Sequence, residues 1–139
     1  MEQNMNAKDL NVMSSILHKH HFRDISLSFY ENKHLNEKTF HQFLEGVHKS
    51  EHLHSLNVNL RWCDQVTDSW LKKLGEAPHH DSLRHFELWV WNCKHVTDKG
   101  LEHLLEALSN CSNLETLKLY LGDTAMTNHS AGILKNFTD

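Results

Sequence analysis

The sequence predicts an α/β fold: a short solenoid of about four strand–helix units, with a parallel sheet on its concave face and an N-terminal capping helix. Three observations predict it. One pattern of apolar, cysteine and threonine residues recurs about every thirty residues, the apolar spacing changes within each copy, and an amphipathic stretch precedes the first copy. A chain of 139 residues is long enough for one such domain with its own core.

The repeat is clearest in its second and third copies. "CDQVTDSWLKKL" at 63–74 is followed by "CKHVTDKGLEHL" at 93–104, and ten positions of these copies match at an offset of thirty. Another copy begins at Phe22 and a fourth at Leu114. We therefore expect residues 1–21 to form the capping helix and residues 22–139 the repeat domain, with repeats at about 22–51, 52–81, 82–112 and 113–139.

Each copy contains two kinds of periodicity. In "LNVNLRW" at 56–62, apolar residues alternate with polar ones, which is typical of a strand buried on one face. Trp62 continues the apolar positions, so we expect it in the core. The second half of each copy has apolar residues three and four apart, which is the spacing of an amphipathic helix. Helix N-caps are predicted between the two halves, at Leu35-Asn36-Glu37, Val66-Thr67-Asp68, Val96-Thr97-Asp98 and Met126-Thr127-Asn128.

The two ends of the solenoid lead to different expectations. Leu10, Met13, Ile16 and Leu17 predict an amphipathic helix over about residues 7–20 that closes the first repeat. At the other end, "AGILKNFTD" follows the last strand without a polar capping unit. Because a terminal coil without a cap exposes its core, we expect a partner to cover the C-terminal repeat edge.

The pattern L-x-x-L-x-L-x-L-x-x-C-x-x-V-T-D resembles the leucine-rich repeats of the ribonuclease-inhibitor-like class, in the cysteine-containing variant associated with protist proteins. The resemblance covers the four copies and implies parallel strands that line a concave surface, helices outside, and a protein-binding scaffold. Two copies depart from the pattern, since Asn32 stands where Cys63 and Cys93 stand and the last copy is one residue short. Irregular terminal repeats are expected of a solenoid.

Composition excludes several classes of partner. The formal net charge is −4 and no block of five basic residues occurs, so we expect no nucleic-acid binding. No apolar run approaches the roughly 18 residues of a membrane span. Three cysteines without paired spacing fit a reducing compartment. We therefore expect an intracellular protein, cytoplasmic by default, and the sequence leaves a mitochondrial or ciliary complex open.

The sequence carries no recognisable motif of catalysis or metal binding. The chain has no nucleophile elbow, no phosphate-binding glycine loop and no H-E-x-x-H motif, so we expect neither an enzyme nor a cofactor. Cys63 and Cys93 are predicted to be buried structural thiols, with a metal or redox pair as the alternative. Cys111 adds no C-x-x-C spacing, so no metal site is predicted.

Fourteen histidines are distributed along the chain. Most fall at positions predicted to face solvent, and we interpret them as solvated surface. The alternative is a partner affinity that changes near pH 6, where imidazoles gain charge. The residues concerned are His18, His20, His21, His41, His48, His79, His80, His95 and His103.

The strand positions that alternate with the core are the predicted binding residues, because they line the concave surface. Aromatic and arginine side chains, which dominate binding hot spots, are frequent among them. The alternatives are that a loop or the N-terminal segment covers them, or that they are simply exposed. The predicted protein-binding residues are Tyr30, Asn57, Asn59, Arg61, Glu87, Trp89, Trp91, Lys118 and Tyr120, with Ser26 and Ser28 beside them.

The sequence therefore predicts a non-catalytic protein–protein interaction module, a small scaffold or assembly subunit of a larger complex. One alternative is substrate recognition for ubiquitin ligation, because cysteine-containing repeats resemble those of F-box adaptors. Only about 21 residues precede the first repeat, so an F-box would have to lie on another chain. A second alternative is a regulator that inhibits an enzyme, as ribonuclease inhibitor does.

Overall fold

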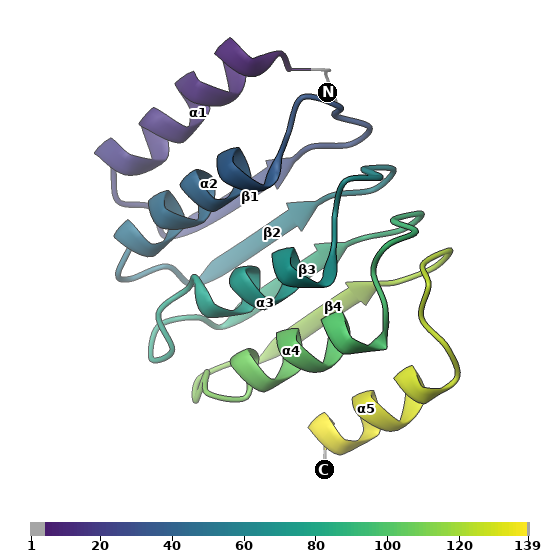
Figure 1. Cartoon of the computed structure of the whole chain (residues 1–139). Coiled ribbons are helices and arrows are strands. Elements are labelled where there is room, and N and C mark those ends of the chain that lie inside the picture. The colour runs from purple at the N-terminus through teal and green to yellow at the C-terminus, as the bar shows by residue number, and fades with distance from the viewer. Residues whose placement is uncertain (1–4, 139) are drawn as a thin grey trace.

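The computed structural model describes residues 5–138 and contains four strands that alternate with helices (Figure 1). The sheet is parallel throughout, with the strand order β1-β2-β3-β4. This arrangement confirms the predicted fold class. The elements are α1 (Ala7–Lys19), β1 (Asp24–Ser28), α2 (Glu37–Lys49), β2 (Ser55–Asn59), α3 (Asp68–Glu76), β3 (His85–Trp89), α4 (Asp98–Leu108), β4 (Thr116–Tyr120) and α5 (His129–Thr138).

Each strand, with the turn and helix that follow it, forms one coil. Coil one contains β1 and α2, coil two β2 and α3, coil three β3 and α4, and coil four β4 and α5. The coils stack in the register that the repeat predicts: Leu56 lies between Ile25 and Phe86. The helices cover one face of the sheet and leave the other uncovered (Figure 1). We call the uncovered side the open face.

The core lies between the sheet and the helices. In β2 and β3 the burial alternates residue by residue, and the inward side chains such as Leu56, Val58 and Leu88 are at most 1% exposed. Burying one such side chain contributes about 1.5–3 kcal/mol. Aromatic rings join the first two coils, because Trp70 of α3 stacks on Phe40 of α2 with ring centroids 4.7 Å apart.

Aspartates at the first position of two helices clamp consecutive coils together. The carboxylate of Asp68 accepts hydrogen bonds from the backbone N–H and the hydroxyl of Thr97, at 2.7 and 2.5 Å. Asp98 accepts the same two bonds from Thr127 of coil four. The sequence predicts only helix capping for this segment. Thr67 is the N-cap of α3, as predicted, but its side chain accepts no hydrogen bond from the first turn of the helix. The predicted side-chain cap is therefore wrong at this helix.

The clamp at Asp98 predicts a pH dependence of stability. The two bonds from Thr127 lower the pKa of Asp98 from its usual value. A lowered carboxyl pKa stabilises the folded state above the unfolded pKa of about 3.9, and this contribution is lost as the pH falls through the folded pKa. We expect the free energy of unfolding to fall between about pH 5 and pH 2, and Asp98→Asn to flatten that profile. Urea unfolding at stepped pH measures both chains, and identical profiles would contradict the assignment.

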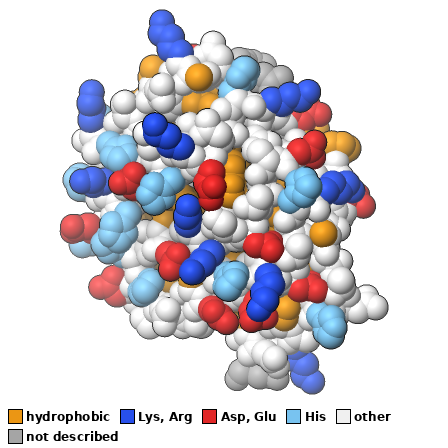
Figure 2. Space-filling model, in the orientation of Figure 1, with side chains coloured by type: hydrophobic (Ala, Val, Ile, Leu, Met, Phe, Trp, Pro, Cys, Tyr) orange, Lys and Arg blue, Asp and Glu red, His pale blue; other side chains and the backbone are white. Residues whose placement is uncertain are grey.

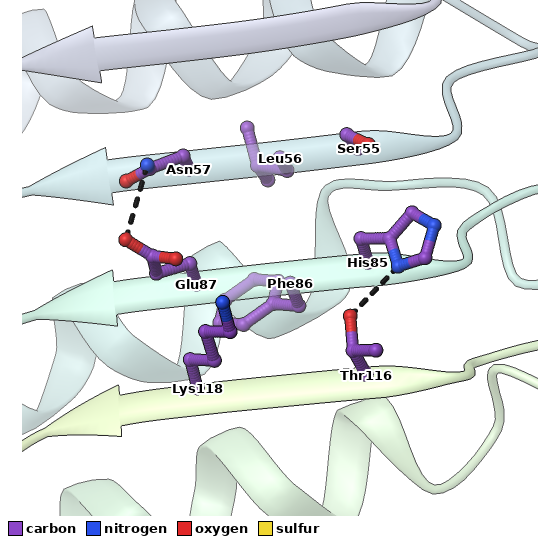
Figure 3. A pocket seen from close by; sticks show the side chains of 8 residues that line it. All are labelled: Ser55, Leu56, Asn57, His85, Phe86, Glu87, Thr116 and Lys118. Carbon is purple, nitrogen blue, oxygen red and sulfur yellow. Dashed lines mark hydrogen bonds between the residues drawn. The ribbon is translucent and has the colours of Figure 1, made fainter.

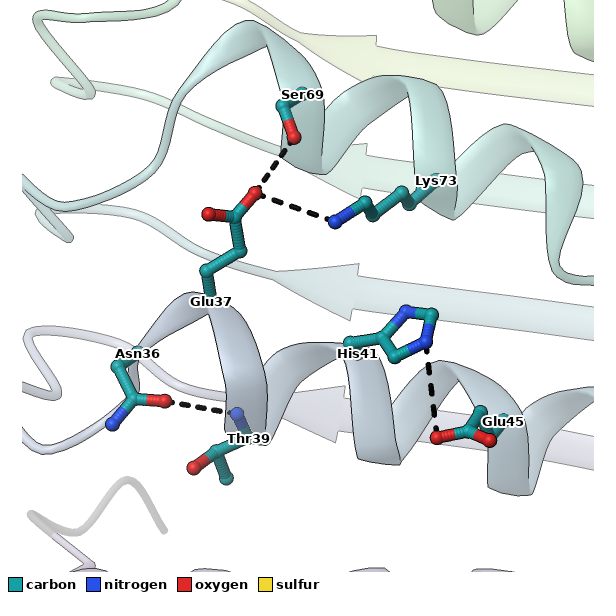
Figure 4. Close-up of polar contacts among 7 residues, drawn as sticks. All are labelled: Asn36, Glu37, Thr39, His41, Glu45, Ser69 and Lys73. Carbon is teal, nitrogen blue, oxygen red and sulfur yellow. Dashed lines mark hydrogen bonds and ion pairs between the residues drawn. The ribbon is translucent and has the colours of Figure 1, made fainter.

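Coil one and coil two are joined by a different set of side chains (Figure 4). Glu37 of α2 accepts a hydrogen bond from the Ser69 hydroxyl at 2.7 Å and pairs with Lys73 at 3.4 Å. These two partners lower the pKa of Glu37. Asn36 caps α2 by accepting from the backbone N–H of Thr39. Because the Glu37–Lys73 ion pair is exposed, it contributes little to the free energy of unfolding.

The repeated cysteines are buried, as predicted. The thiol of Cys63 donates to the carbonyl of Phe29 at 2.9 Å, and Cys93 donates to Leu60 at 3.1 Å. Burial raises the pKa of Cys63 to about 12 and that of Cys93 to about 11. Each thiol therefore stays protonated at neutral pH and acts as a donor between coils.

Asn32 occupies the same slot in the first coil and explains its departure from the repeat. Its side-chain oxygen accepts from the backbone N–H groups of His34 and Leu35, at 2.8 and 3.0 Å. Its amide nitrogen donates to the carbonyl of Met5, just before α1. A thiol has too few polar groups to make all three bonds. Asparagine therefore ties the cap to the first coil.

The prediction that Trp62 lies in the core is wrong. Its side chain is 52% exposed, and its backbone φ is 62°, in the left-handed region. The left-handed residue reverses the alternation after Leu60, so the ring turns outward. The same slot is left-handed in every coil, where the other residues are Glu31, Asn92 and Asp123.

Helix α1 covers the outer side of coil one. Leu10 and Leu17 are buried there, whereas Ile16, which was predicted to face inward, is 47% exposed. The close approach of α1 to α2 requires glycine at position 46, because a Cβ there would lie 2.6 Å from the Cβ of Leu17.

This contact predicts different effects for two glycines. Gly46→Ala is expected to lower the free energy of unfolding by about 1–3 kcal/mol, because the cap helix has to move outward. Gly132→Ala in α5, where a Cβ meets nothing within 4 Å, is expected to raise it by up to about 1 kcal/mol through helix propensity. Urea unfolding of the two variants measures the difference, and equal effects would contradict the packing of α1.

Candidate protein-binding surface

The predicted binding residues lie in and directly after the strands. Asn57 and Asn59 are in β2, Glu87 and Trp89 in β3, and Lys118 and Tyr120 in β4, while Tyr30, Arg61 and Trp91 follow the ends of β1, β2 and β3. Trp91 is 46% exposed and Tyr120 is 37% exposed, so no segment within residues 5–138 covers them.

A ladder of aromatic and cationic side chains crosses all four coils. The guanidinium carbon of Arg61 lies 4.9 Å from the ring centroid of Tyr30 and 5.0 Å from that of Trp89. Trp89 in turn stacks on Tyr120, with centroids 3.6 Å apart and planes 13° apart. A cation between two rings gains electrostatic energy, about 0.5–1 kcal/mol per contact at exposed sites. The ladder therefore fixes four large side chains before any partner arrives.

Polar side chains hold the ladder in place. The Trp89 indole N–H donates to Oε2 of Glu87 at 2.7 Å, and the amide nitrogen of Asn57 donates to the same oxygen at 3.2 Å. Oδ1 of Asn59 accepts from Nε of Arg61 at 3.2 Å and from its backbone N–H at 3.0 Å. The carboxylate and the two amides thus set the orientation of the ring and of the guanidinium.

Beside the ladder the open face has a shallow hollow of about 370 Å³ (Figure 3). Its floor is the backbone of β2 and β3, and its polar lining includes Asn57, Glu87 and Lys118. His85 reaches across to the hydroxyl of Thr116 at 2.7 Å. The mixed charges and the Asn57 amide suit polar side chains of a peptide better than an apolar cofactor.

Charged side chains gather where the strands begin. Glu115 pairs with Arg84 at 3.9 Å and with His85 at 3.7 Å. Partial desolvation and the neighbouring charges of Arg23 and Arg84 lower the pKa of His54. A lowered pKa favours the neutral form of His54.

Two tryptophans form the rim of the surface at the carboxyl ends of the strands. The indole N–H of Trp91 donates to Oδ2 of Asp123 at 2.8 Å, and the backbone N–H of Trp62 donates to the carbonyl of Trp91 at 3.0 Å. The exposed Trp62 is a further candidate binding residue, which strict alternation places in the core. The signal was present in the repeat, because the corresponding slots carry Glu31, Asn92 and Asp123, all polar. The left-handed φ belongs to the turn of every coil, so Trp62 is distinguished by carrying a large exposed ring at this slot.

The outer face of the helix layer has a different character. Figure 2 shows lysine, arginine, acidic and histidine side chains interspersed over it. His41 and His95 are exposed and His103 is half-buried, in agreement with the interpretation of these histidines as solvated surface. His48 departs from it, because its ring nitrogen Nδ1 bonds to the carbonyl of Ala77 at 2.8 Å and the ring stacks on His79. The mixture of both charges is typical of a solvated helix face and provides a control region for mutation.

The described part of the chain, residues 5–138, contains no group of three or more His, Cys, Asp or Glu side chains placed to hold a metal ion. None of the helices within those residues is long and apolar enough to cross a membrane.

Comparisons with known proteins support the fold. No family model matches the chain, and a search of curated proteins finds no match. Among solved structures, the chain is similar to the tropomodulin C-terminal domain from Caenorhabditis elegans, with a TM-score of 0.62 and 15% sequence identity, over 93% of this chain and 73% of that one. That domain has a leucine-rich-repeat-like fold, so the similarity agrees with the solenoid. The narrower ribonuclease-inhibitor-like, cysteine-containing class stays a prediction.

Proposed function

We propose that this protein is a non-catalytic protein-binding module, a small scaffold or assembly subunit that holds a partner protein on its open face. The observation that carries the proposal is the ladder of Tyr30, Arg61, Trp89 and Tyr120. Its side chains are of the types that dominate hot spots, and they are already ordered. Ordering before binding reduces the conformational entropy that association costs.

The shape and chemistry of the open face favour a protein partner. The aromatic ladder, the polar hollow and the rim tryptophans extend over four adjacent strands. A surface of aromatic anchors surrounded by polar groups is typical of protein interfaces. The hollow is shallow and lined by mixed charges, which suits one side of a partner surface rather than an enclosed small molecule.

A second contact is proposed at the C-terminal edge. The apolar residues of coil four are only half-buried, although the same slots in coil three are fully buried. A partner that covers this edge removes exposed apolar surface and stabilises both proteins. The residues concerned are Leu114, Leu117, Leu119, Leu121 and Met126.

The test is the size of the native assembly. We expect the tagged full chain, expressed in its source cells and released by mild lysis, to elute with a stable complex well above its own mass of 16.3 kDa. Recovery with ubiquitin-ligase components would favour the adaptor alternative over an assembly subunit. Elution of the whole population at the mass of the single chain would contradict the proposal.

A further inference from the structure

The interfaces between coils use one repeated set of backbone hydrogen bonds. Just after each strand, two N–H groups of one coil donate to two carbonyls of the next, as Val90 and Asn92 do to Tyr120 and Gly122, at 3.0 and 2.9 Å. Just before each strand, one carbonyl accepts two N–H groups. The donors at the three interfaces are His54 and Ser55 to Arg23, Arg84 and His85 to His54, and Glu115 and Thr116 to Arg84.

Coil four presents the same set at its outer edge, where the described chain provides no further coil. The corresponding groups are the N–H of Leu121, the N–H of Asp123 and the carbonyl of Glu115. Their spacing is that of a parallel pair, because the three interfaces inside the molecule are all parallel. An added strand that runs in the same direction as β4 satisfies all of them.

A side chain at the same edge is also arranged for a following coil. Asn128 occupies the position of the repeat that Asp68 and Asp98 occupy in the two preceding coils; each of these residues lies thirty positions after the one before it. Those aspartates accept from the backbone N–H and the hydroxyl of a threonine in the next coil. The Asn128 amide can accept from the N–H through its oxygen and donate to the hydroxyl through its nitrogen. The expected complement is therefore a threonine or serine.

The apolar surface and the aromatic ladder point to the same occupant. Leu117, Leu119 and Leu121 form an alternating row that only an alternating strand matches in register. Tyr120 is the last member of the ladder, and Trp89 covers one of its ring faces. The other face looks toward the outer edge, where an aromatic ring or a guanidinium extends the stack.

We propose that the outer edge of coil four is a docking site for a strand–turn–helix coil of a partner protein, added in parallel to β4. Its strand alternates apolar residues, its turn carries threonine or serine opposite Asn128, and an aromatic or arginine side chain lies beside Tyr120. A second copy of this chain does not fit. In a second copy α1 packs beside α2, in the helix-layer position before it, so stacking the copy's β1 on β4 would bring its α1 against α5. Antiparallel pairing of two β4 strands separates the two turns.

The inference rests on the proposed assembly role, and hydrogen exchange of the native complex tests it. We expect the amides of residues 114–123 to exchange at least about tenfold more slowly in the complex than in the isolated chain, as paired strands do. Equal rates would overturn the proposal. Concentration-dependent protection of the isolated chain, with a dimer in sedimentation velocity, would also overturn it, because the occupant is then a second copy.

Two variants locate the contact and separate it from the open face. Leu119→Lys places a charge in the apolar row at the outer edge and is expected to abolish the protection at 114–123. Trp89→Ala with Trp91→Ala removes open-face contacts. In complexes that this variant still forms, residues 114–123 are expected to stay protected. If the tryptophan variant loses the complex and Leu119→Lys keeps it, the open face supplies most of the binding energy. Protection of residues 114–123 that survives Leu119→Lys would overturn the edge proposal. Unfolding in urea confirms that each variant is folded.

Discussion

Trp70→Ala is expected to lower the free energy of unfolding by about 3–5 kcal/mol, the largest effect of any single substitution discussed for this chain. Trp70 is 2% exposed and stacks on Phe40, which contacts Phe29 edge to face at 6.4 Å. Alanine leaves a cavity between coils one and two. The cavity cannot close unless the helices or strands move out of the register in which the two coils pair. Because a domain is stable by about 5–15 kcal/mol, this loss is a large share of the total.

A matched tryptophan provides the control. Trp62→Asn replaces an exposed ring in a left-handed turn by a residue that tolerates this conformation. We expect its free energy of unfolding to stay within about 0.5 kcal/mol of the parent or to rise. Urea unfolding followed by far-ultraviolet circular dichroism compares the two. A loss at Trp62 as large as that at Trp70 would contradict the burial pattern.

Trp89→Ala combined with Trp91→Ala is expected to weaken partner binding by about 100-fold or more. Truncating one hot-spot aromatic costs at least about 2 kcal/mol, and about 1.4 kcal/mol corresponds to tenfold in affinity. Trp89 also holds the ladder together, because it contacts Arg61, Tyr120 and Glu87. The affinity of the purified partner, measured by titration calorimetry, tests the prediction.

The control for this variant lies on the opposite face of the molecule. His80→Ala with His103→Ala changes two side chains beside a hollow on the helix layer. We expect the partner affinity of this control to equal that of the parent. Equal affinity of the tryptophan variant and the parent would show that the partner binds elsewhere.

The fold was predictable because the period of thirty residues fixes the stacking. Leu56 and Phe86 occupy one slot of the repeat, and the structure places them side by side in a parallel sheet. The alternation within each strand likewise predicted which side chains line the open face. Both inferences depend on backbone periodicity, which the sequence records directly.

What the sequence did not predict depends on turns and on rotamers. The outward position of Trp62 follows from a left-handed residue, and a rule of strict alternation does not include such a reversal. The exposure of Ile16 follows from how α1 packs against α2, where Gly46 allows the close approach of Leu17. The placement of Arg61 between two rings depends on side-chain torsions that periodicity does not determine.

The roles of the threonine and aspartate pairs were also only partly predictable. Helix-start chemistry is visible in Thr97-Asp98, and Thr97 does accept a cap bond from the N–H of Lys99. The clamp between Asp98 and Thr127 joins residues 29 positions apart, so it follows only from the stacked coils. Threonine therefore has two roles here: Thr97 caps α4 and also bonds to Asp68 of the preceding coil.

The most direct test is oxidative footprinting of the chain, free and bound to the partner recovered from its native complex. Trp91 and Tyr120 are exposed on or beside the open face, and His41 is exposed on α2. A partner seated on the open face predicts slower oxidation of Trp91 and Tyr120 on binding and an unchanged rate at His41. Protection of His41 with no change at Trp91 and Tyr120 would contradict the account.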